Sequence, residues 1–287
     1  MIVYLNGRFL PAESATISVF DRGFLYGDGL FESVRVYANH LFLWPDHADR
    51  LVRGAAALRL PLPETTDRLR EAAEELLRRN QLSDAILRMT VSRGPGPRGY
   101  SIRGADTPTV VLAVYPAPAL TDTPPPAWRL ITSRHRLPAA DPVARFKTAH
   151  KLLHVLARAE AEEGGADEAL LLNTDGHVTE TSAANVFWWH DRTLSTPSLD
   201  AGGLAGVTRR FVMDQFRAAG WEVREILATP EDLRRASGVF LTLSSWGIVG
   251  VRSLDRTPWT EDPRLQEFQR GYRVSVRDAI ENRRICH

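Results

Sequence analysis

The sequence predicts a mixed α/β protein built in two parts, and three observations lead to that fold class. The chain has 287 residues, of which 44% are hydrophobic and 25% charged, so it can bury a substantial core. Short apolar or alternating runs typical of strands are interspersed with longer segments of helical periodicity. Between residues 116 and 126, five of eleven residues are proline, which neither a helix nor an inner strand accepts. We therefore expect a small N-terminal domain at 1–117, a Pro-rich linker at 118–127 and a larger domain at 128–287.

The N-terminal part is expected to begin with a hairpin, because its first ten residues alternate around Asn6-Gly7, a strong turn signal. A turn at Asn39-His40 is expected to join the next two strands. The remaining predicted elements are strands at Leu30–Tyr37, Leu41–Leu43, Ala85–Val91 and Thr109–Tyr115, and helices from Pro45 to about Leu60 and from about Glu64 to Arg79.

The C-terminal part is predicted to continue the α/β pattern. Its expected strands are Trp128–Ser133, Ala169–Leu172, Asn185–Trp189 and Val239–Leu243, and its expected helices are Thr148–Glu163, Thr208–Ala219, Glu231–Arg235 and Pro263–Asn282. In the first of these helices, Lys151 is expected one turn inside the helix. The apolar stripe of the same helix is expected to face the core and consists of Leu152, Val155, Leu156 and Ala159.

Charge and cysteine content exclude several classes of protein. With 36 basic and 35 acidic residues the net charge is +1, so no broad cationic surface for nucleic acid or membranes is implied. No apolar run reaches the ~18 residues of a membrane span, and the N-terminus does not resemble a signal peptide. The single cysteine, Cys286, rules out a disulfide framework within the chain and a zinc site made of several thiolates. A cytoplasmic location is therefore favoured.

Two motifs have a more ordinary interpretation than their pattern suggests. Gly94–Gly99 matches G-x-G-x-x-G, but its two prolines lack amide donors and no helix follows, so we expect a rigid loop that presents Arg98 and Tyr100 instead of a dinucleotide site. His150 and His154 have the spacing of metal ligands on a helix, but the glutamate of H-E-x-x-H is missing. We expect no metal site there.

Lysine is nearly absent from the chain. Only two of the 36 basic residues are lysine, Lys147 and Lys151. Arginine cannot attack a carbonyl to form an imine, so any lysine chemistry has only these two candidates.

Three further features could be structural or functional when each is taken alone. Glu180 precedes an apolar strand, where it could cap a turn or hold a proton on a ring nitrogen. Gly206-Val207-Thr208 opens a helix and could be an ordinary N-terminus or a phosphate site. The hydroxyls of 242–245 end a strand and could also bind phosphate.

In their order along the chain, these segments resemble the class IV (fold type IV) pyridoxal-phosphate enzymes. That family includes branched-chain aminotransferases, D-amino acid aminotransferases and 4-amino-4-deoxychorismate lyases. The resemblance covers nearly the whole chain and rests on Asp21–Ser33, His47–Leu51, Lys147, Glu180–Asn185 and Leu204–Arg209. It implies a two-domain fold, pyridoxal 5'-phosphate as cofactor, a small-molecule amino substrate and a homodimer whose subunits share the active site.

The resemblance also implies roles for individual residues. Lys147 would hold the cofactor as a Schiff base and then move the substrate proton, while Glu180 would pair with the ring nitrogen. The phosphate would be held by Arg50, Ser244, the amides of Val207 and Thr208, and the Thr208 hydroxyl. One departure is His150, which stands where the family often has asparagine.

Among the family's activities, the lyase fits this sequence best. Val91–Ser101 is similar to the Ser-Arg-Gly-x-Gly-x-Arg-Gly-Tyr-Ser segment of the lyases, and Ser33 keeps a hydroxyl that could assist the departing group. The expected substrate contacts are Phe31, Arg98 and Tyr100. A D-amino acid aminotransferase, in which Arg98 would bind the substrate carboxylate, and a branched-chain aminotransferase remain alternatives. A relative that kept the fold only for binding is the alternative outside enzymes.

Overall fold

The computed structural model describes residues 1–260 and 262–284, with side chains up to residue 281. Cys286 therefore lies outside the described residues. The chain forms two compact units. The first unit contains Met1–Leu120, Phe146–His150 and the end of the last helix from Ala279, and the second contains Thr121–Arg145 and Lys151–Asp278. The division is not a single cut in the Pro-rich segment, because 146–150 packs with the first unit.

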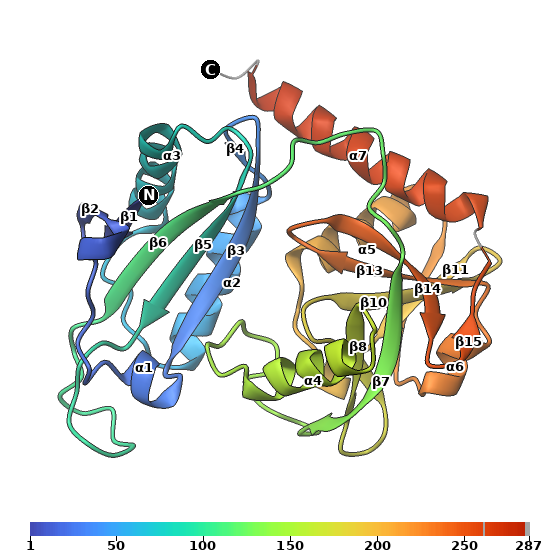
Figure 1. The fold of residues 1–287 in the computed structure, drawn as a ribbon, viewed down its shortest axis with the longest axis horizontal. Coiled ribbons are helices and arrows are strands. Elements are labelled where there is room, and N and C mark those ends of the chain that lie inside the picture. Colours follow the sequence, from blue (N-terminus) through green and yellow to red (C-terminus); the bar gives the residue numbers. More distant parts are fainter. Residues whose placement is uncertain (261, 285–287) are drawn as a thin grey trace. The chain divides into compact units, whose positions relative to one another are not determined.

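The first unit is built on a six-stranded antiparallel sheet in the order β2-β1-β6-β5-β3-β4 (Figure 1). Its strands are β1 Ile2–Leu5, β2 Arg8–Pro11, β3 Gly29–Tyr37, β4 His40–Leu41, β5 Ala85–Ser92 and β6 Thr109–Pro116. The β1–β2 hairpin at Asn6-Gly7 confirms the prediction. The turn before β4 lies at Ala38-Asn39, both with positive φ, one residue earlier than predicted.

Two amphipathic helices cover one face of this sheet (Figure 1). They are α2 Trp44–Ala57 and α3 Thr66–Asn80, both confirming predicted helices. Leu51 of α2 and Leu76 of α3 are among the residues that pack with Leu30 and Val34 of β3 in one hydrophobic cluster. A short helix, α1 Arg22–Tyr26, was not predicted because five residues give too little periodicity.

The second unit is built on a nine-stranded mixed sheet, in which eight strands follow the order β12-β11-β10-β13-β14-β7-β8-β9 and β15 pairs with β14. Its strands are β7 Trp128–Leu137, β8 Glu168–Asn173, β9 Val178–Thr181, β10 Asn185–His190, β11 Thr193–Pro197, β12 Glu222–Ile226, β13 Gly238–Leu243, β14 Gly247–Leu254 and β15 Thr257–Pro258. Its helices are α4 Leu152–Glu163, α5 Val207–Ala218, α6 Pro230–Arg234 and α7 Pro263–Arg284, the last of which belongs to this unit up to Asp278.

The helix predicted at Thr148–Glu163 begins later than expected. It starts at Leu152, so Lys151 occupies the N-cap position and the prediction that it lies one turn inside was wrong. The predicted orientation was also wrong, because Leu152, Val155, Leu156 and Ala159 are exposed in the chain. The buried positions are instead Ala157 and Ala161, since alanine lets the helix approach the sheet closely. His150 precedes the helix, so it does not share a helical face with His154.

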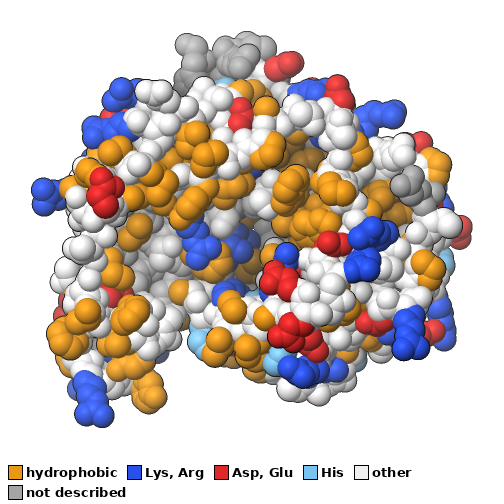
Figure 2. All heavy atoms as spheres, viewed as in Figure 1, with side chains coloured by type: hydrophobic (Ala, Val, Ile, Leu, Met, Phe, Trp, Pro, Cys, Tyr) orange, Lys and Arg blue, Asp and Glu red, His pale blue; other side chains and the backbone are white. Residues whose placement is uncertain are grey.

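The predicted β5, β6, β7, β8, β10 and β13 are all present, whereas β9, β11, β12, β14 and β15 were not predicted. β12 has the sequence Glu-Val-Arg-Glu-Ile and lies at an edge of the sheet, where charged residues are tolerated. β14 contains two glycines, which weaken the strand signal. Among the described residues, no helix is both long and apolar enough to span a membrane. Basic and acidic side chains are interspersed on the face shown in Figure 2.

Candidate active site

Lys147 lies in an extended segment at an edge of the first sheet. The Phe31 N–H donates to the Lys147 carbonyl over 2.8 Å, and the Ala149 N–H donates to the Gly29 carbonyl over 2.8 Å. A β-bridge also joins Leu30 to Thr148. Lys147 therefore stands opposite Phe31, and opposed residues of paired strands project to the same face.

The face that carries Lys147 also carries the predicted residues Phe31 and Ser33. The Lys147 Nζ lies 4.6 Å from the centre of the Phe31 ring, and Cζ of Arg88 lies 3.5 Å from it. Both cations therefore contact one aromatic ring. Ser33 pairs directly with Arg88 in the β3–β5 register. An amine, a hydroxyl and a guanidinium are thus gathered on the sheet face opposite the one that Leu30 and Val34 bury against α2 and α3.

Sequence reasoning missed Arg88, because one arginine within an alternating strand looks like an ordinary surface residue. It is half-buried, and burial lowers the pKa of its guanidinium while Tyr115 and Glu32 raise it. Arginine nevertheless stays protonated in proteins. Within the described part of the chain, Arg88 has no hydrogen bond or ion pair, so it suits a ligand carboxylate.

Arg50 is held in a buried ion-pair cluster on the helix-covered face of the same sheet. Its Nε and Nη2 donate to the two Glu32 oxygens over 2.8 and 2.6 Å. His47 Nδ1 lies 2.7 Å from Glu32 Oε2, and the carboxylate must be the acceptor. Because Glu32 already takes the Nε–Nη2 edge of Arg50, a bidentate grip on phosphate through that edge would require Glu32 to release it.

The charges in this cluster follow from burial and pairing. Burial alone would raise the pKa of Glu32, but the charge and hydrogen bonds of Arg50, with those of His47, lower it to about 2. Burial lowers the pKa of His47, against the raising effect of Glu32. Glu32 is therefore ionised, and its negative charge balances the positive charge of Arg50. Neither Glu32 nor His47 was predicted as a site residue, because the contact between β3 and α2 that brings them to Arg50 leaves no local pattern in the sequence.

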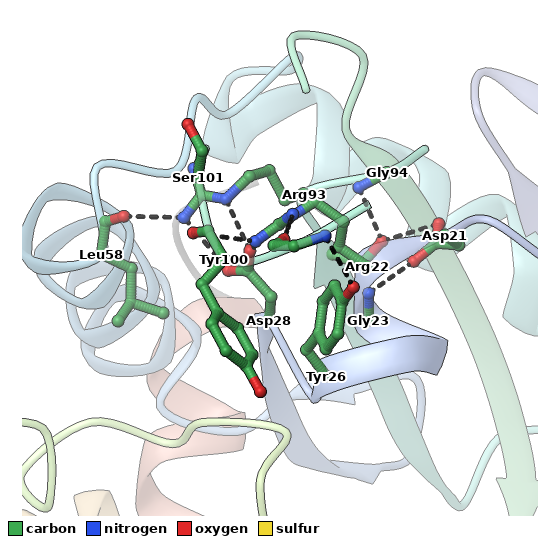
Figure 3. A network of polar contacts seen from close by, with 12 residues as sticks. Asp21, Arg22, Gly23, Tyr26, Asp28, Leu58, Arg93, Gly94, Tyr100 and Ser101 are labelled. Atoms are coloured by element: carbon green, nitrogen blue, oxygen red, sulfur yellow. Dashed lines mark hydrogen bonds and ion pairs between the residues drawn. The ribbon is translucent and has the colours of Figure 1, made fainter. Parts of the chain in front are cut away.

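Hydrogen bonds and ion pairs, drawn in Figure 3, connect the loop that carries Tyr100 to the rest of the first unit. Arg22 donates to the Gly99 carbonyl over 2.8 Å and, through Nε, to Asp28 over 2.9 Å. Arg93 also binds Asp28 over 2.8 Å and donates to the Leu58 carbonyl. The prediction of a fixed loop with no following helix agrees with this geometry. Arg98 and Tyr100 are exposed, and Tyr100 lies against Tyr26 with 5.6 Å between ring centres.

Glu180 lies buried on β9 in the second unit. His154 Nε2 lies 3.0 Å from its Oε1, and the Leu204 N–H donates to Oε2 over 2.8 Å. Burial alone would raise the pKa of Glu180, but the His154 hydrogen bond, the charges of Lys151 and His154 and the Leu204 amide lower it. A buried, ionised carboxylate of this kind can stabilise a nearby cation.

The segment after Leu204 places the predicted phosphate residues Val207 and Thr208 at the start of α5. No side chain caps this helix among the described residues, so its first amides remain available for an anion. A Cβ on Gly206 would meet Asn185 Oδ1 at 1.9 Å, so only glycine allows this close approach. Ser244 lies in the turn directly after β13.

A buried hydroxyl without a partner lies in the same part of the second unit. Thr242 stands opposite Asn185 in the β10–β13 register. Within residues 1–260 and 262–284, its Oγ1 has no hydrogen-bond partner although it is buried. An unpaired buried hydroxyl is costly unless a ligand or water satisfies it. Four features of the second unit fit a phosphate ester that carries a cationic ring. They are the uncapped start of α5, the close backbone approach at Gly206, the unpaired Thr242 hydroxyl and the ionised Glu180. Pyridoxal 5'-phosphate is a molecule with this chemistry.

Comparison with known proteins defines the class. The family model described as amino-transferase class IV matches residues 29–254. A putative branched-chain-amino-acid aminotransferase of Methanocaldococcus jannaschii is 37% identical over 89% of this chain and 88% of its own length. An aminodeoxychorismate lyase of Bacillus subtilis is 32% identical over 88% of this chain and 87% of its own, and a D-alanine aminotransferase of Bacillus licheniformis is 29% identical over 89% of each.

Solved structures agree with this result. A 4-amino-4-deoxychorismate lyase from Pseudomonas aeruginosa has a TM-score of 0.82 and 33% identity, over 93% of this chain and 97% of its own. A branched-chain aminotransferase from Thermoproteus uzoniensis has a TM-score of 0.89 and 29% identity, over 96% and 94%. Another branched-chain enzyme, with a TM-score of 0.87 and 29% identity over 96% and 93%, was solved with pyridoxamine 5'-phosphate. The chain belongs to the class IV aminotransferase family and is a pyridoxal-phosphate-dependent enzyme.

Proposed function

We propose that the protein is a 4-amino-4-deoxychorismate lyase, which splits its substrate into 4-aminobenzoate and pyruvate. All substrate atoms appear in the two products, so the reaction consumes no oxidant, reductant or water. The observation that carries the proposal is the sheet face on which the Lys147 amine, the Ser33 hydroxyl and the Arg88 guanidinium lie near one another.

Pyridoxal 5'-phosphate, when bound, supplies a carbonyl that captures the substrate amine and a protonated ring that withdraws electrons. Lys147 would hold this group through Nζ and later accept, at the same atom, the proton from the substrate carbon next to nitrogen. Glu180, which stays ionised in the second unit, would keep the ring nitrogen protonated. The phosphate would be held by Arg50, Val207, Thr208 and Ser244.

The polar groups around Phe31 match the substrate of the lyase. Within the described residues the Ser33 hydroxyl has no hydrogen-bond partner, so it can donate to the ether oxygen that leaves with pyruvate. The substrate carries two carboxylates, and the half-buried Arg88 suits one of them. Arg98, which is exposed and lies two residues before Tyr100 on the same loop, is the candidate for the other.

An aminotransferase acting on branched-chain or D-amino acids is the second candidate. The 37% identity to the putative branched-chain enzyme of Methanocaldococcus jannaschii favours it. Arg88 alone does not separate the two, because the acceptor 2-oxoglutarate also has two carboxylates. Ser33 does favour the lyase, since a transaminase has no ether to cleave.

A two-substrate assay tests this assignment. The purified enzyme receives 4-amino-4-deoxychorismate in one reaction, and D-alanine or L-leucine with 2-oxoglutarate in two others. We expect pyruvate and 4-aminobenzoate in equal amounts from the first and little glutamate from the others. Strong activity only with an amino acid donor would reject the lyase. Ser33→Ala should lower lyase turnover about tenfold, the effect of one lost hydrogen bond to a developing charge.

We also propose that the enzyme is a homodimer. Apolar side chains are exposed on the segment before and within α1, where Phe20 is 66% and Phe24 is 70% exposed. Figure 2 shows hydrophobic side chains gathered over this part of the first unit. The α4 stripe in the second unit, including Leu152 and Val155, is exposed as well. Apolar patches of this kind are typical of surfaces that another protein chain covers, and a second copy is the partner that the family resemblance implies.

A further inference from the structure

Glu180 has an unusual set of partners for a buried carboxylate. Its side chain is 9% exposed, yet among the described residues it contacts neither lysine nor arginine. It is held by the His154 ring over 3.0 Å and the Leu204 amide over 2.8 Å. Two carboxylate oxygens can accept about four hydrogen bonds, so acceptor capacity remains for a further donor.

Among the described residues, Glu180 is the hydrogen-bond partner of the His154 ring. It lies in the first turn of α4, and this helix packs on β7 and β8 (Figure 1). Its side chain is 13% exposed and directs Nε2 toward Glu180 Oε1. Because an ionised carboxylate only accepts hydrogen bonds, Nε2 must carry the proton. The charge of Lys151, at the N-cap of the same helix, also lowers the pKa of Glu180.

We propose that His154 is a positioning residue for Glu180: its Nε2–H fixes the rotation of the carboxylate and sets the charge that Glu180 presents to the cofactor ring nitrogen. This inference rests on the proposed function, in which Glu180 keeps that nitrogen protonated. The Leu204 amide fixes one oxygen, so loss of His154 would leave the other free to rotate or to be solvated. The sequence offered no sign of this role, because His154 stood out only by its spacing from His150, as a metal ligand would.

The test compares His154→Ala and His154→Gln with the wild type after reconstitution with pyridoxal 5'-phosphate. The readouts are the visible absorbance band of the bound cofactor as a function of pH, the cofactor dissociation constant, and kcat and KM. A hydrogen bond to a charged group is worth about 1.5–3 kcal/mol, so His154→Ala should shift the band and lower kcat about 10- to 100-fold with KM little changed. Glutamine can also donate an N–H to Glu180, so His154→Gln should recover part of both effects.

Two comparisons separate this role from a structural one. Leu153→Ala, a change in the same helix that disturbs its packing with Ala157 and Ala161, should lower Tm without shifting the band. In a Glu180→Gln background, His154→Ala should cause no further loss of kcat, because the residue acts through Glu180. If His154→Ala lowers only Tm, as Leu153→Ala does, or adds its full loss to Glu180→Gln, the proposal is wrong.

The design also distinguishes failure of this inference from failure of the proposed function. If the wild-type protein develops the visible band but cleaves no aminodeoxychorismate, the lyase assignment is wrong. The role of His154 is then decided by comparing the bands of the wild type and His154→Ala. Wild-type protein that takes up no pyridoxal 5'-phosphate would overturn both. A band and cofactor affinity that are identical in wild type and His154→Ala would overturn the inference alone.

Discussion

The two lysines differ in their surroundings although they are four residues apart. Lys147 extends the first sheet with its amine beside the Phe31 ring, whereas Lys151 begins α4 in the second unit. An amine next to an aromatic ring and a second cation, Arg88, is in the more specialised setting. Lys147 is therefore the expected point of covalent attachment.

Replacement of each lysine by alanine tests this assignment. After reconstitution and borohydride reduction, the wild type should yield one modified peptide containing residue 147. Lys147→Ala should lose the label and lower turnover by several orders of magnitude, because the sequence holds only one other lysine and that residue belongs to the second unit. Lys151→Ala should keep the label, as peptide mass spectrometry would show. A label on Lys151 in the wild type or in Lys147→Ala would contradict the assignment.

The Glu32 cluster makes the stability of the protein depend on pH. The folded protein holds Glu32 ionised down to about pH 2, whereas its ordinary pKa is 4.5. Between these values the unfolded chain binds a proton that the folded chain does not, so the stabilisation is complete above about pH 4.5 and is lost as pH falls toward 2. A difference of this size corresponds to about 3 kcal/mol.

Urea unfolding of the wild type and Glu32→Gln across this pH range measures the effect. The variant leaves Arg50 buried without its carboxylate, so its free energy of unfolding at pH 7 should be lower by about 3 kcal/mol. The difference in the free energy of unfolding between the two proteins should decrease toward pH 2, where Glu32 becomes protonated in both the folded and the unfolded wild type. A gap that stays constant with pH would show that the charge of Glu32 is not responsible.

One carboxylate, that of Asp28, pairs with both arginines at the base of the loop that carries Arg98 and Tyr100. Asp28 neutralises both Arg22 and Arg93, and Arg22 in turn binds the Gly99 carbonyl (Figure 3). Burial would raise the pKa of Asp28, but its hydrogen bonds from Arg93 and Arg22 lower it. An ionised Asp28 therefore holds Arg22 of α1 and Arg93, and Arg22 binds the loop.

Asp28→Asn should release the loop from the sheet. Two buried guanidinium groups would lose their counter-charge, which is strongly destabilising. We expect trypsin to cut native protein after Arg98 or Arg103 about tenfold faster, since cleavage concentrates at mobile exposed segments. Glu75→Gln is the matched control, because Glu75 also binds two arginines, but on the exposed face of α3. Equal cleavage of both variants would contradict the role of Asp28.

Periodicity and turn chemistry predict the elements whose stabilising contacts are local. The β1–β2 hairpin, α2 and α3 were predicted correctly because their apolar spacing matches what their own cluster buries. The start of α4 and its buried face were not, because Leu152 and Val155 have the spacing of a core stripe but are exposed in the chain. The spacing of apolar residues does not by itself show whether a helical stripe is buried in its own chain or exposed.

The residues proposed for the site divide in the same way, into those with a local sequence signal and those without one. Lys147, Glu180 and the α5 start stand out by residue type and order, and the resemblance ties them together. Arg88, Glu32 and His154 could not be predicted, because their positions depend on contacts with residues 18 to 57 positions away along the chain: Arg88 with Phe31, Glu32 with Arg50, and His154 with Glu180. Such pairings are set by the register of strands and helices and leave no local pattern.

The association state of the whole enzyme is the remaining prediction. If a second copy covers the apolar surface near α1, Phe24→Asp should convert dimers to monomers at micromolar concentration. Burying one phenylalanine is worth about 1.5–3 kcal/mol, and a two-fold symmetric interface loses it twice, so self-association should weaken at least about a hundredfold. Val52→Asp, an exposed apolar position on α2 in the same unit, is the control and should remain dimeric. Sedimentation velocity would separate these outcomes. A wild type that is monomeric throughout, or a Phe24→Asp protein as dimeric as the wild type, would contradict the dimer through this surface.

The resemblance implies an active site shared between subunits, so the monomeric variant should also lose turnover. The loss should be proportional to the fraction of protein that is no longer dimeric. Turnover per subunit that rises with protein concentration would link activity to dimer formation.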